Sequence, residues 1–253
     1  MDAREEQRLV DLLKRSNSIL IFTGAGVSTG SGIPDFRGPQ GIWKTRTPVY
    51  YQDFMSSDEA RRKYWEQKLE GWEKFRNARP NAVHRAVAHI EQTEKLLMVV
   101  TQNIDGLHRE AGTSPGRLVE LHGTMGFVEC QTCHRRGDPE PYYREFRETR
   151  KPPVCSCGGY MKTATISFGQ SLRQEDLERA FHAAEHTDLA IALGSTLSVT
   201  PAAHVPLHAA QRGAPYVIIN RGETEHDHYP QVTLRIEGDV GEIFPRAVKE
   251  ALP

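Results

Sequence analysis

The sequence has no excess of either charge and no long hydrophobic segment. Its 253 residues carry 32 lysines and arginines against 33 aspartates and glutamates, which gives a net charge of −1. This balance predicts no broad basic surface, so we expect no direct nucleic-acid binding. No apolar run approaches the ~20 residues of a membrane helix, so we expect no membrane partner either.

Cysteine is also scarce, with four residues in the whole chain. Residues 1–6 are polar and acidic, unlike a signal peptide, and this predicts a cytoplasmic protein. In a reducing compartment, cysteines serve as metal ligands or free thiols more often than as disulfides.

Two common nucleotide-binding motifs are missing. An apolar run at 18–22, which predicts a buried strand, leads into a loop with glycines at 24, 26, 30, 32 and 38. The usual dinucleotide fingerprint needs its third glycine at position 29, where Thr29 stands, and no Gly-Lys-Ser/Thr of a P-loop follows. A strand followed by close glycines still suits phosphate oxygens, and Arg37 adds a cation for a pyrophosphate. A bare surface loop would not explain the proline, aromatic and paired charges of residues 34–37.

This loop carries a family resemblance. Residues 24–29 read GAGVST and residues 32–38 read GIPDFRG, and together they resemble the signature of the sirtuins, the NAD-dependent protein-lysine deacylases. The resemblance extends from about residue 13 to the C-terminus. It implies NAD as a co-substrate, held in this loop by the following residues: Gly24, Ala25, Gly26, Thr29, Ile33, Asp35, Phe36 and Arg37.

A second predicted strand, residues 96–101, is followed by three polar residues and one isoleucine that suit a ligand site: Gln102, Asn103, Ile104 and Asp105. Ligands lie at the carboxyl ends of strands in an open parallel sheet. The same residues are also typical of a simple turn at the end of a strand. The resemblance places Asn103 and Asp105 in the nicotinamide pocket and Gln102 at the ribose. It counts Ile104 with the cofactor-binding residues and Asn103 also with the catalytic ones.

One of the eleven histidines stands out by position. His122 follows an apolar segment and precedes Gly123, and histidine can act as a general base near neutral pH. On the residues alone His108 competes with it. The resemblance identifies His122 as the catalytic histidine.

All four cysteines fall into two close pairs, Cys130 with Cys133 and Cys155 with Cys157. Such spacing predicts a closed, structural Cys₄ zinc site with one ion. The Cys-x-Cys spacing of the second pair requires a tighter turn, and His134 is a reserve ligand. Free thiols, or a nucleic-acid-binding zinc ribbon, are the alternatives.

Further strand ends extend the predicted NAD site. Gly194, Ser195 and Thr196 follow a strand at 188–193 and suit phosphate oxygens. The resemblance assigns Asn220 to the adenine-side ribose and Asp239 to the adenine, although Asp239 equally suits a helix cap. It also implies that Phe168 and Gly169 hold the substrate peptide as an added strand.

These elements predict an α/β fold: a Rossmann-like, mostly parallel sheet with helices on both faces. We expect one catalytic domain over 1–253, with a helical insertion at about 39–77 and a zinc-binding module at about 125–160. Residues 163–169 should return the chain to the main sheet. An aromatic-rich insertion is expected to cover the glycine loop, and the resemblance implies a mobile, cofactor-covering segment around 39–48. The oligomeric state expected is a monomer.

The resemblance implies that acyl-lysine proteins or peptides are deacylated at the expense of NAD. The acyl oxygen attacks the nicotinamide ribose, nicotinamide leaves, and His122 then acts as base on a ribose hydroxyl, giving O-acyl-ADP-ribose. Some sirtuins bind acidic acyl groups through a Tyr-x-x-Arg pair, which this sequence lacks. Acetyl or longer apolar acyl groups are therefore expected. The alternatives are mono-ADP-ribosyl transfer, an NAD-dependent oxidoreductase and a non-catalytic zinc-bearing binding module.

Overall fold

The main sheet of the protein has six parallel strands in the order β3-β2-β1-β7-β8-β9. The computed structural model describes residues 3–36, 38 and 41–253. The strands are β1 (Ile19–Thr23), β2 (Leu96–Thr101), β3 (Leu118–Glu120), β7 (Leu189–Leu193), β8 (Tyr216–Asn220) and β9 (Leu234–Glu237). Three of them, β1, β7 and β8, are buried along their whole length, as expected of short apolar runs with helices on both sides.

Helices cover both faces of this sheet, and the side chains of β1 alternate between them. Ile19 and Ile21 pack in one core with α1 (Ala3–Arg15), α4 (Ala82–Gln92) and α9 (Val240–Ala251). Leu20 and Phe22 pack in the other with α7 (Gln174–His186) and α8 (His204–Gln211). This period of two is what a strand buried on both faces requires. The predicted fold class is confirmed.

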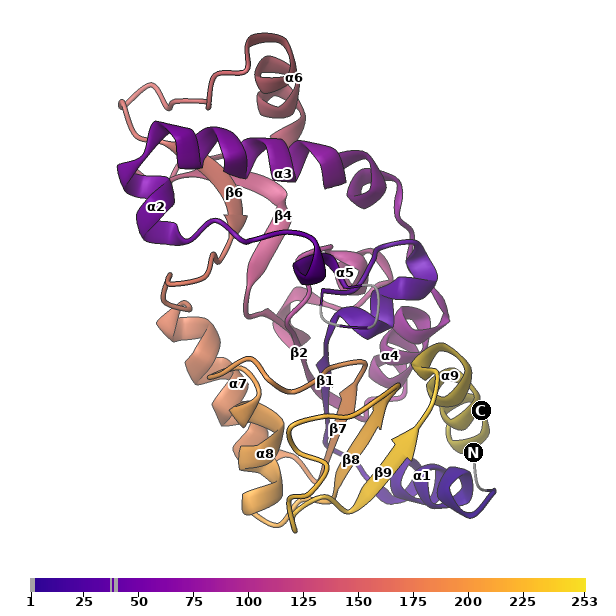
Figure 1. Cartoon of the computed structure of the whole chain (residues 1–253). Helices are drawn as coiled ribbons and strands as arrows, with labels where there is room; N and C mark the ends of the chain where they lie inside the picture. Colours follow the sequence, from indigo (N-terminus) through magenta and orange to yellow (C-terminus); the bar gives the residue numbers. More distant parts are fainter. Residues whose placement is uncertain (1–2, 37, 39–40) are drawn as a thin grey trace.

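A second structural unit lies beyond the carboxyl ends of the strands (Figure 1). It contains a three-stranded antiparallel sheet of β4 (Gly123–Cys130), β5 (Arg136–Gly137) and β6 (Met161–Thr165), with α6 (Pro139–Thr149), α2 (Tyr51–Ser56) and α3 (Asp58–Asn77). Its core is rich in aromatic residues, including Trp65, which packs edge-on against Tyr143.

The prediction that residues 163–169 rejoin the main sheet is wrong. Strand β6 pairs with β4 in the antiparallel sheet, with Thr165 opposite Gly123. The chain returns to the main sheet only through α7 and β7. Strand β4 starts directly after His122, and the glycine-rich sequence GTMGFVEC gave no strand signal.

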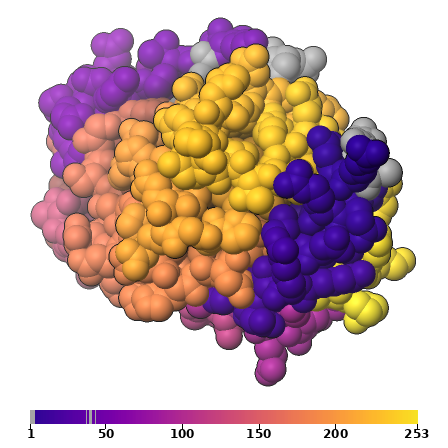
Figure 2. Space-filling view, turned by 90° about the horizontal axis from the view of Figure 1, so that it is seen from below, coloured from indigo at the N-terminus to yellow at the C-terminus, as the bar shows by residue number. Residues whose placement is uncertain are grey.

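The remaining elements are short: η1 (Ala25–Ser31), η2 (Ile42–Lys44), α5 (Leu107–Glu110) and η3 (Pro115–Arg117). Seen from the end opposite the second unit, α1 lies against C-terminal segments of the chain (Figure 2). None of the helices in the described part of the chain has the length and apolar character that crossing a bilayer demands.

Candidate active site

A large cavity of about 970 Å³ opens where the main sheet meets the second unit. It lies at the carboxyl ends of β1, β2, β7 and β8, where ligands bind in open parallel sheets. Most predicted site residues line it: Gly24, Ala25, Gly26, Thr29, Asp35, Phe36, Gln102, Asn103, Ile104, His122, Phe168, Gly169, Gly194, Ser195, Thr196, Asn220 and Asp239. Ile33 and Asp105 are not on its wall, and Arg37 lies outside the described residues.

The glycines of the first loop are needed for packing as well as for ligand approach. A Cβ on Gly26 would lie 2.8 Å from the Cα of Gly194, and one on Gly24 would lie 2.7 Å from the Gly194 carbonyl oxygen. The Gly26 N–H donates to that same oxygen at 2.8 Å. The loops after β1 and β7 therefore touch through their backbones, and they form one continuous floor of the cavity.

A hydrogen-bond chain orients Asn103. Its side-chain amide donates to the Gly24 carbonyl at 3.0 Å and to the Ser28 hydroxyl at 3.1 Å. Ser28 in turn donates to the Asp105 carboxylate at 2.7 Å. Burial raises the pKa of Asp105, while its hydrogen bonds from the Leu107 N–H and from Ser28 oppose that shift. Asp105 thus lies behind the wall and positions Asn103 through Ser28, a residue that sequence reasoning missed.

Gln102 connects three parts of the site. Its side-chain amide donates to the Ser195 hydroxyl at 2.8 Å, and that hydroxyl also accepts the Leu197 N–H at 3.1 Å. Its backbone carbonyl lies 3.0 Å from Nδ1 of His122. The strand ends of β2 and β7 are therefore tied together beside the histidine.

His122 occupies the turn between β3 and β4. Its own carbonyl accepts the Ile166 N–H at 2.8 Å, which ties this turn to the end of β6. Because the Gln102 carbonyl can only accept, Nδ1 of a neutral ring carries the hydrogen and Nε2 carries the basic lone pair.

His108, the competitor on sequence grounds, does not line the cavity. It is fully buried, and its Nε2 lies 3.0 Å from the Thr23 hydroxyl. Burial, followed by the nearby His84, lowers the pKa of His108 to about 3. His84 is also fully buried, and its side chain completes the capping box at the start of α4.

The far end of the cavity holds Asn220 and Asp239. Asp239 caps α9 by accepting the Gly241 N–H at 2.7 Å, and it also pairs with Arg221 at 2.7 Å while lining the cavity. The two sequence interpretations of Asp239, helix cap and ligand wall, are thus compatible.

The segment predicted to hold a peptide as an added strand, Phe168 and Gly169, forms a turn after β6 and not a strand, and α2 contacts it. The Tyr51 N–H donates to the Phe168 carbonyl at 2.9 Å, and the Gln52 side chain donates to the Gly169 carbonyl at 2.9 Å. Further walls that the sequence did not reveal come from the second unit and from the segment after Gly169: Pro48, Val49, Tyr64, Gln67, Lys68, Thr165, Ile166, Gln170, Ser171, Leu172, Gln174 and Leu177.

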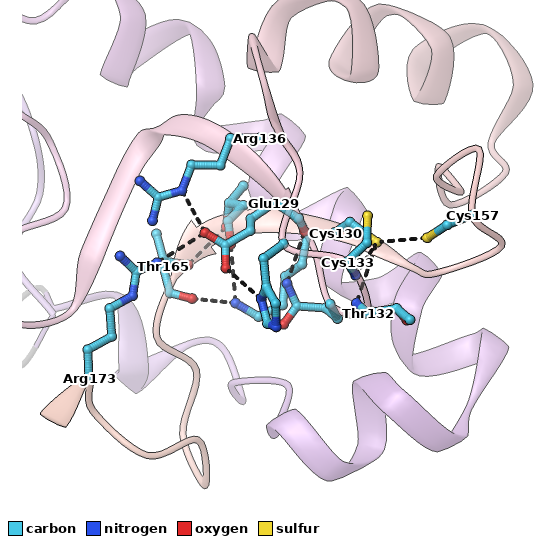
Figure 3. A network of polar contacts seen from close by, with 12 residues as sticks. Glu129, Cys130, Thr132, Cys133, Arg136, Cys157, Thr165 and Arg173 are labelled. Atoms are coloured by element: carbon cyan, nitrogen blue, oxygen red, sulfur yellow. Dashed lines mark hydrogen bonds and ion pairs between the residues drawn. The ribbon is translucent and has the colours of Figure 1, made fainter.

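The four cysteines converge at one end of the antiparallel sheet. All four sulfur atoms lie within 4.8 Å of one another, with 3.6 Å between Cys130 and Cys157 and 3.8 Å between Cys133 and Cys155. A tetrahedron with Zn–S bonds of about 2.3 Å has edges of about 3.8 Å, so the set fits one zinc ion with no position left for water. Figure 3 shows Cys130, Cys133 and Cys157 near Glu129, whose carboxylate accepts hydrogen bonds from Arg136 of β5 and from Arg173 at the start of α7.

Comparisons with known proteins agree with this geometry. Residues 24–201 match the Sir2 family. The chain is 41% identical over 238 residues to an NAD-dependent protein deacetylase of Rhodopseudomonas palustris, covering 93% of each chain. It is 36% identical over 247 residues to NAD-dependent protein deacylase 2 of Archaeoglobus fulgidus, covering 97% of this chain and 96% of the other.

The same fold is found in solved structures. One is a Sir2 protein with a deacetylated p53 peptide and 3′-O-acetyl ADP ribose, with a TM-score of 0.88 and 35% identity, covering 96% of this chain and 97% of the other. The chain described here belongs to the Sir2 family.

Proposed function

We propose that this protein is an NAD-dependent protein-lysine deacylase that removes acetyl or longer apolar acyl groups. The observation that supports it best is the position of His122. His122 lines the cavity and is bonded both to Gln102 at the end of β2 and to Ile166, two residues before Phe168, so a nucleotide and an acyl-lysine would meet beside its Nε2. The names of the relatives support the same activity.

The residues of the chain have distinct tasks in this reaction. Bound NAD would supply an electrophilic ribose carbon with nicotinamide as its leaving group. The amide of Asn103, held by Ser28, would orient the carboxamide end, and Gln102 and Ser195 would contact the ribose and phosphates. Nε2 of His122 accepts the proton of a ribose hydroxyl, because the Gln102 carbonyl keeps the other ring nitrogen protonated.

Protein mono-ADP-ribosyl transfer is the second candidate, since it would use the same NAD site. The two are separated by incubating the protein with NAD and an acetyl-lysine peptide and measuring nicotinamide by chromatography. Deacylation predicts nicotinamide release only when the acylated peptide is present. Release without that peptide, together with ADP-ribose mass on protein, would favour the transferase. No release under either condition, nor with a peptide that carries a longer apolar acyl group, would refute both.

The expected cellular location also belongs to this proposal. Four cysteines placed to bind zinc as thiolates suit a reducing compartment, which supports a cytoplasmic protein. Cell fractionation tests it, and recovery of the protein outside the cytoplasmic fraction would contradict it.

A further inference from the structure

One wall of the cavity carries an ammonium group that the reaction described above does not use. Lys68 lies on α3, one helical turn after Tyr64, and both residues line the cavity with Gln67, Pro48 and Val49. The Lys68 ammonium lies 5.4 Å from the centroid of the Tyr64 ring. Figure 1 shows α3 running across β4 and β6, above the strand ends of the main sheet.

This wall is connected directly to the strands that hold His122. The Tyr64 hydroxyl hydrogen-bonds to Thr163 and lies 3.5 Å from the hydroxyl of Thr165. Thr165 is the ladder partner of Gly123, the residue after His122, and the next residue, Ile166, bonds to the His122 carbonyl. A group that extends beyond an acyl carbonyl held at His122 therefore has this α3 wall within reach.

The Lys68 ammonium has no carboxylate partner among the described residues. The two carboxylates on the described cavity wall are engaged elsewhere, since Asp35 accepts the Gly38 N–H at 2.8 Å and Asp239 pairs with Arg221. Gln67 donates its side-chain amide to the Thr47 carbonyl at 3.0 Å. The part of the cavity wall around Lys68 thus carries the positive charge of its ammonium and no opposing carboxylate among the described residues.

A second buried ammonium strengthens the positive potential. Lys162 of β6 is 1% exposed, lies 5.6 Å from the Tyr64 ring, and donates to the Thr163 and Thr165 carbonyls. Burial, followed by the charge of Lys68, lowers the pKa of Lys162 to about 7. Burial also lowers the pKa of Lys68 to about 8, so at neutral pH the half-buried Lys68 is mostly protonated.

We propose that Lys68 is a specificity residue that admits acyl groups ending in a carboxylate, such as short dicarboxylic acyl chains on lysine. The inference rests on the proposed deacylase function and extends its substrate class. An ammonium without a partner in a partly dehydrated cavity gains a charge-assisted hydrogen bond from such a carboxylate, whereas a methyl group at the same place leaves it unpaired. The cation comes from a position outside the Tyr-x-x-Arg pattern, which is why the sequence alone favoured apolar acyl groups.

The test uses three peptides that differ only in the acyl group: acetyl, succinyl and the neutral succinamoyl, which ends in an amide. The readout is the ratio of kcat/KM for succinyl to that for succinamoyl. We expect this ratio to fall at least tenfold in Lys68→Met, since a hydrogen bond to a charged group contributes about 1.5–3 kcal/mol. Lys68→Arg should keep most of the ratio. Lys63→Met removes an exposed lysine of the same helix and should leave the ratio unchanged.

The outcomes separate this inference from the proposed function. A ratio that is the same in the wild type and in Lys68→Met overturns the role of Lys68. Turnover of the acetyl peptide without turnover of the succinyl peptide overturns the substrate class while the deacylase function stands. Failure to turn over any of the three peptides and also a fourth peptide with a longer apolar acyl group refutes the deacylase function itself.

Discussion

At the scale of single residues, the proposed reaction depends on one ring nitrogen, Nε2 of His122. Nδ1 of His122 faces a carbonyl oxygen, so the ring is oriented and its tautomer is set before any ligand binds. His108 has the same side chain, but it is enclosed by the core and away from the cavity. Both histidines were candidates from the sequence. Only the placement of β2, β3 and β4 distinguishes the proposed base, His122, from the buried His108.

Replacing the base should remove turnover while leaving the fold intact. We expect His122→Ala to lower kcat/KM for an acetyl-lysine peptide by at least about 100-fold, the lower range of general-base contributions. Melting temperature and zinc content should stay near those of the wild type. His186→Ala, at an exposed position on α7, serves as the control. Near-normal turnover by His122→Ala would exclude this role.

The buried histidine pair predicts how stability depends on pH. The rings of His84 and His108 lie 4.8 Å apart, and Nε2 of His84 and Nδ1 of His108 have no hydrogen-bond partner in the described part of the chain. Burial lowers their pKa values to about 4 and about 3, from 6.5. Since the folded pKa values are lowered, the unfolded chain binds protons first as pH falls through 6.5, and stability is lost with it.

The loss should reach about 2 kcal/mol per histidine in the free energy of unfolding between pH 7 and pH 5, as an upper value. Urea unfolding at a series of pH values measures it. Burial raises the pKa values of three carboxyl groups, and these groups oppose the loss of stability as the pH falls: Asp105, Glu120 and Asp176. The comparison is therefore with His108→Gln, which should show a weaker pH dependence. Equal slopes for the two proteins would contradict the assignment.

At the scale of elements, the floor of the cavity is a contact between two loops. Gly26→Ala would force a methyl group against the Gly194 backbone, and overpacking of this kind costs about 1–3 kcal/mol. We expect a lower melting temperature and weaker NAD binding by calorimetric titration. Gly116→Ala has open space around its Cβ and is the matched control. Unchanged NAD affinity in Gly26→Ala would show that the loop contact does not shape the site.

The zinc module is coupled to the main sheet through Glu129. Burial opposes ionisation of this carboxyl, but Arg136 and Arg173 hold its pKa below the usual value. Arg173 stands at the start of α7, which packs on the main sheet. Loss of the module's structure would therefore disturb the segment between β6 and α7, which contains Phe168 and Gly169.

Removal of one zinc ligand tests this coupling. Cys155→Ser should reduce bound zinc well below one ion per chain, measured by atomic absorption, and lower the melting temperature and deacylation together. Ser156→Ala changes the residue between the second pair of cysteines and should retain the metal. Full activity of a zinc-free protein would contradict a structural role for the ion.

At the scale of the whole molecule, the prediction succeeded where information is local. Buried strands ending in glycines or polar residues, and cysteines in close pairs, could be predicted from spacing alone, because strand ends and ligand pairs are short-range features. The parts that failed are long-range. The prediction placed β6 in the wrong sheet because its partner strand, β4, has no clear strand signal in the sequence.

The same limit applies to the cavity walls. Lys68 and Tyr64 reach the site only because α3 crosses the strands that carry His122, and no local pattern in residues 58–77 encodes that crossing. Ser28 was missed for a similar reason, since its link between Asn103 and Asp105 forms only when the ends of β1 and β2 lie side by side.

The central claim is that the acyl group leaves lysine for the ribose of NAD. Mass spectrometry of a reaction containing wild-type protein, NAD and an acetyl-lysine peptide tests it most directly. Transfer of the acyl group to NAD predicts NAD-dependent loss of the acetyl mass from the peptide and an equal amount of O-acetyl-ADP-ribose. Loss of the acetyl group without NAD, or with free acetate as the only initial product, would contradict it.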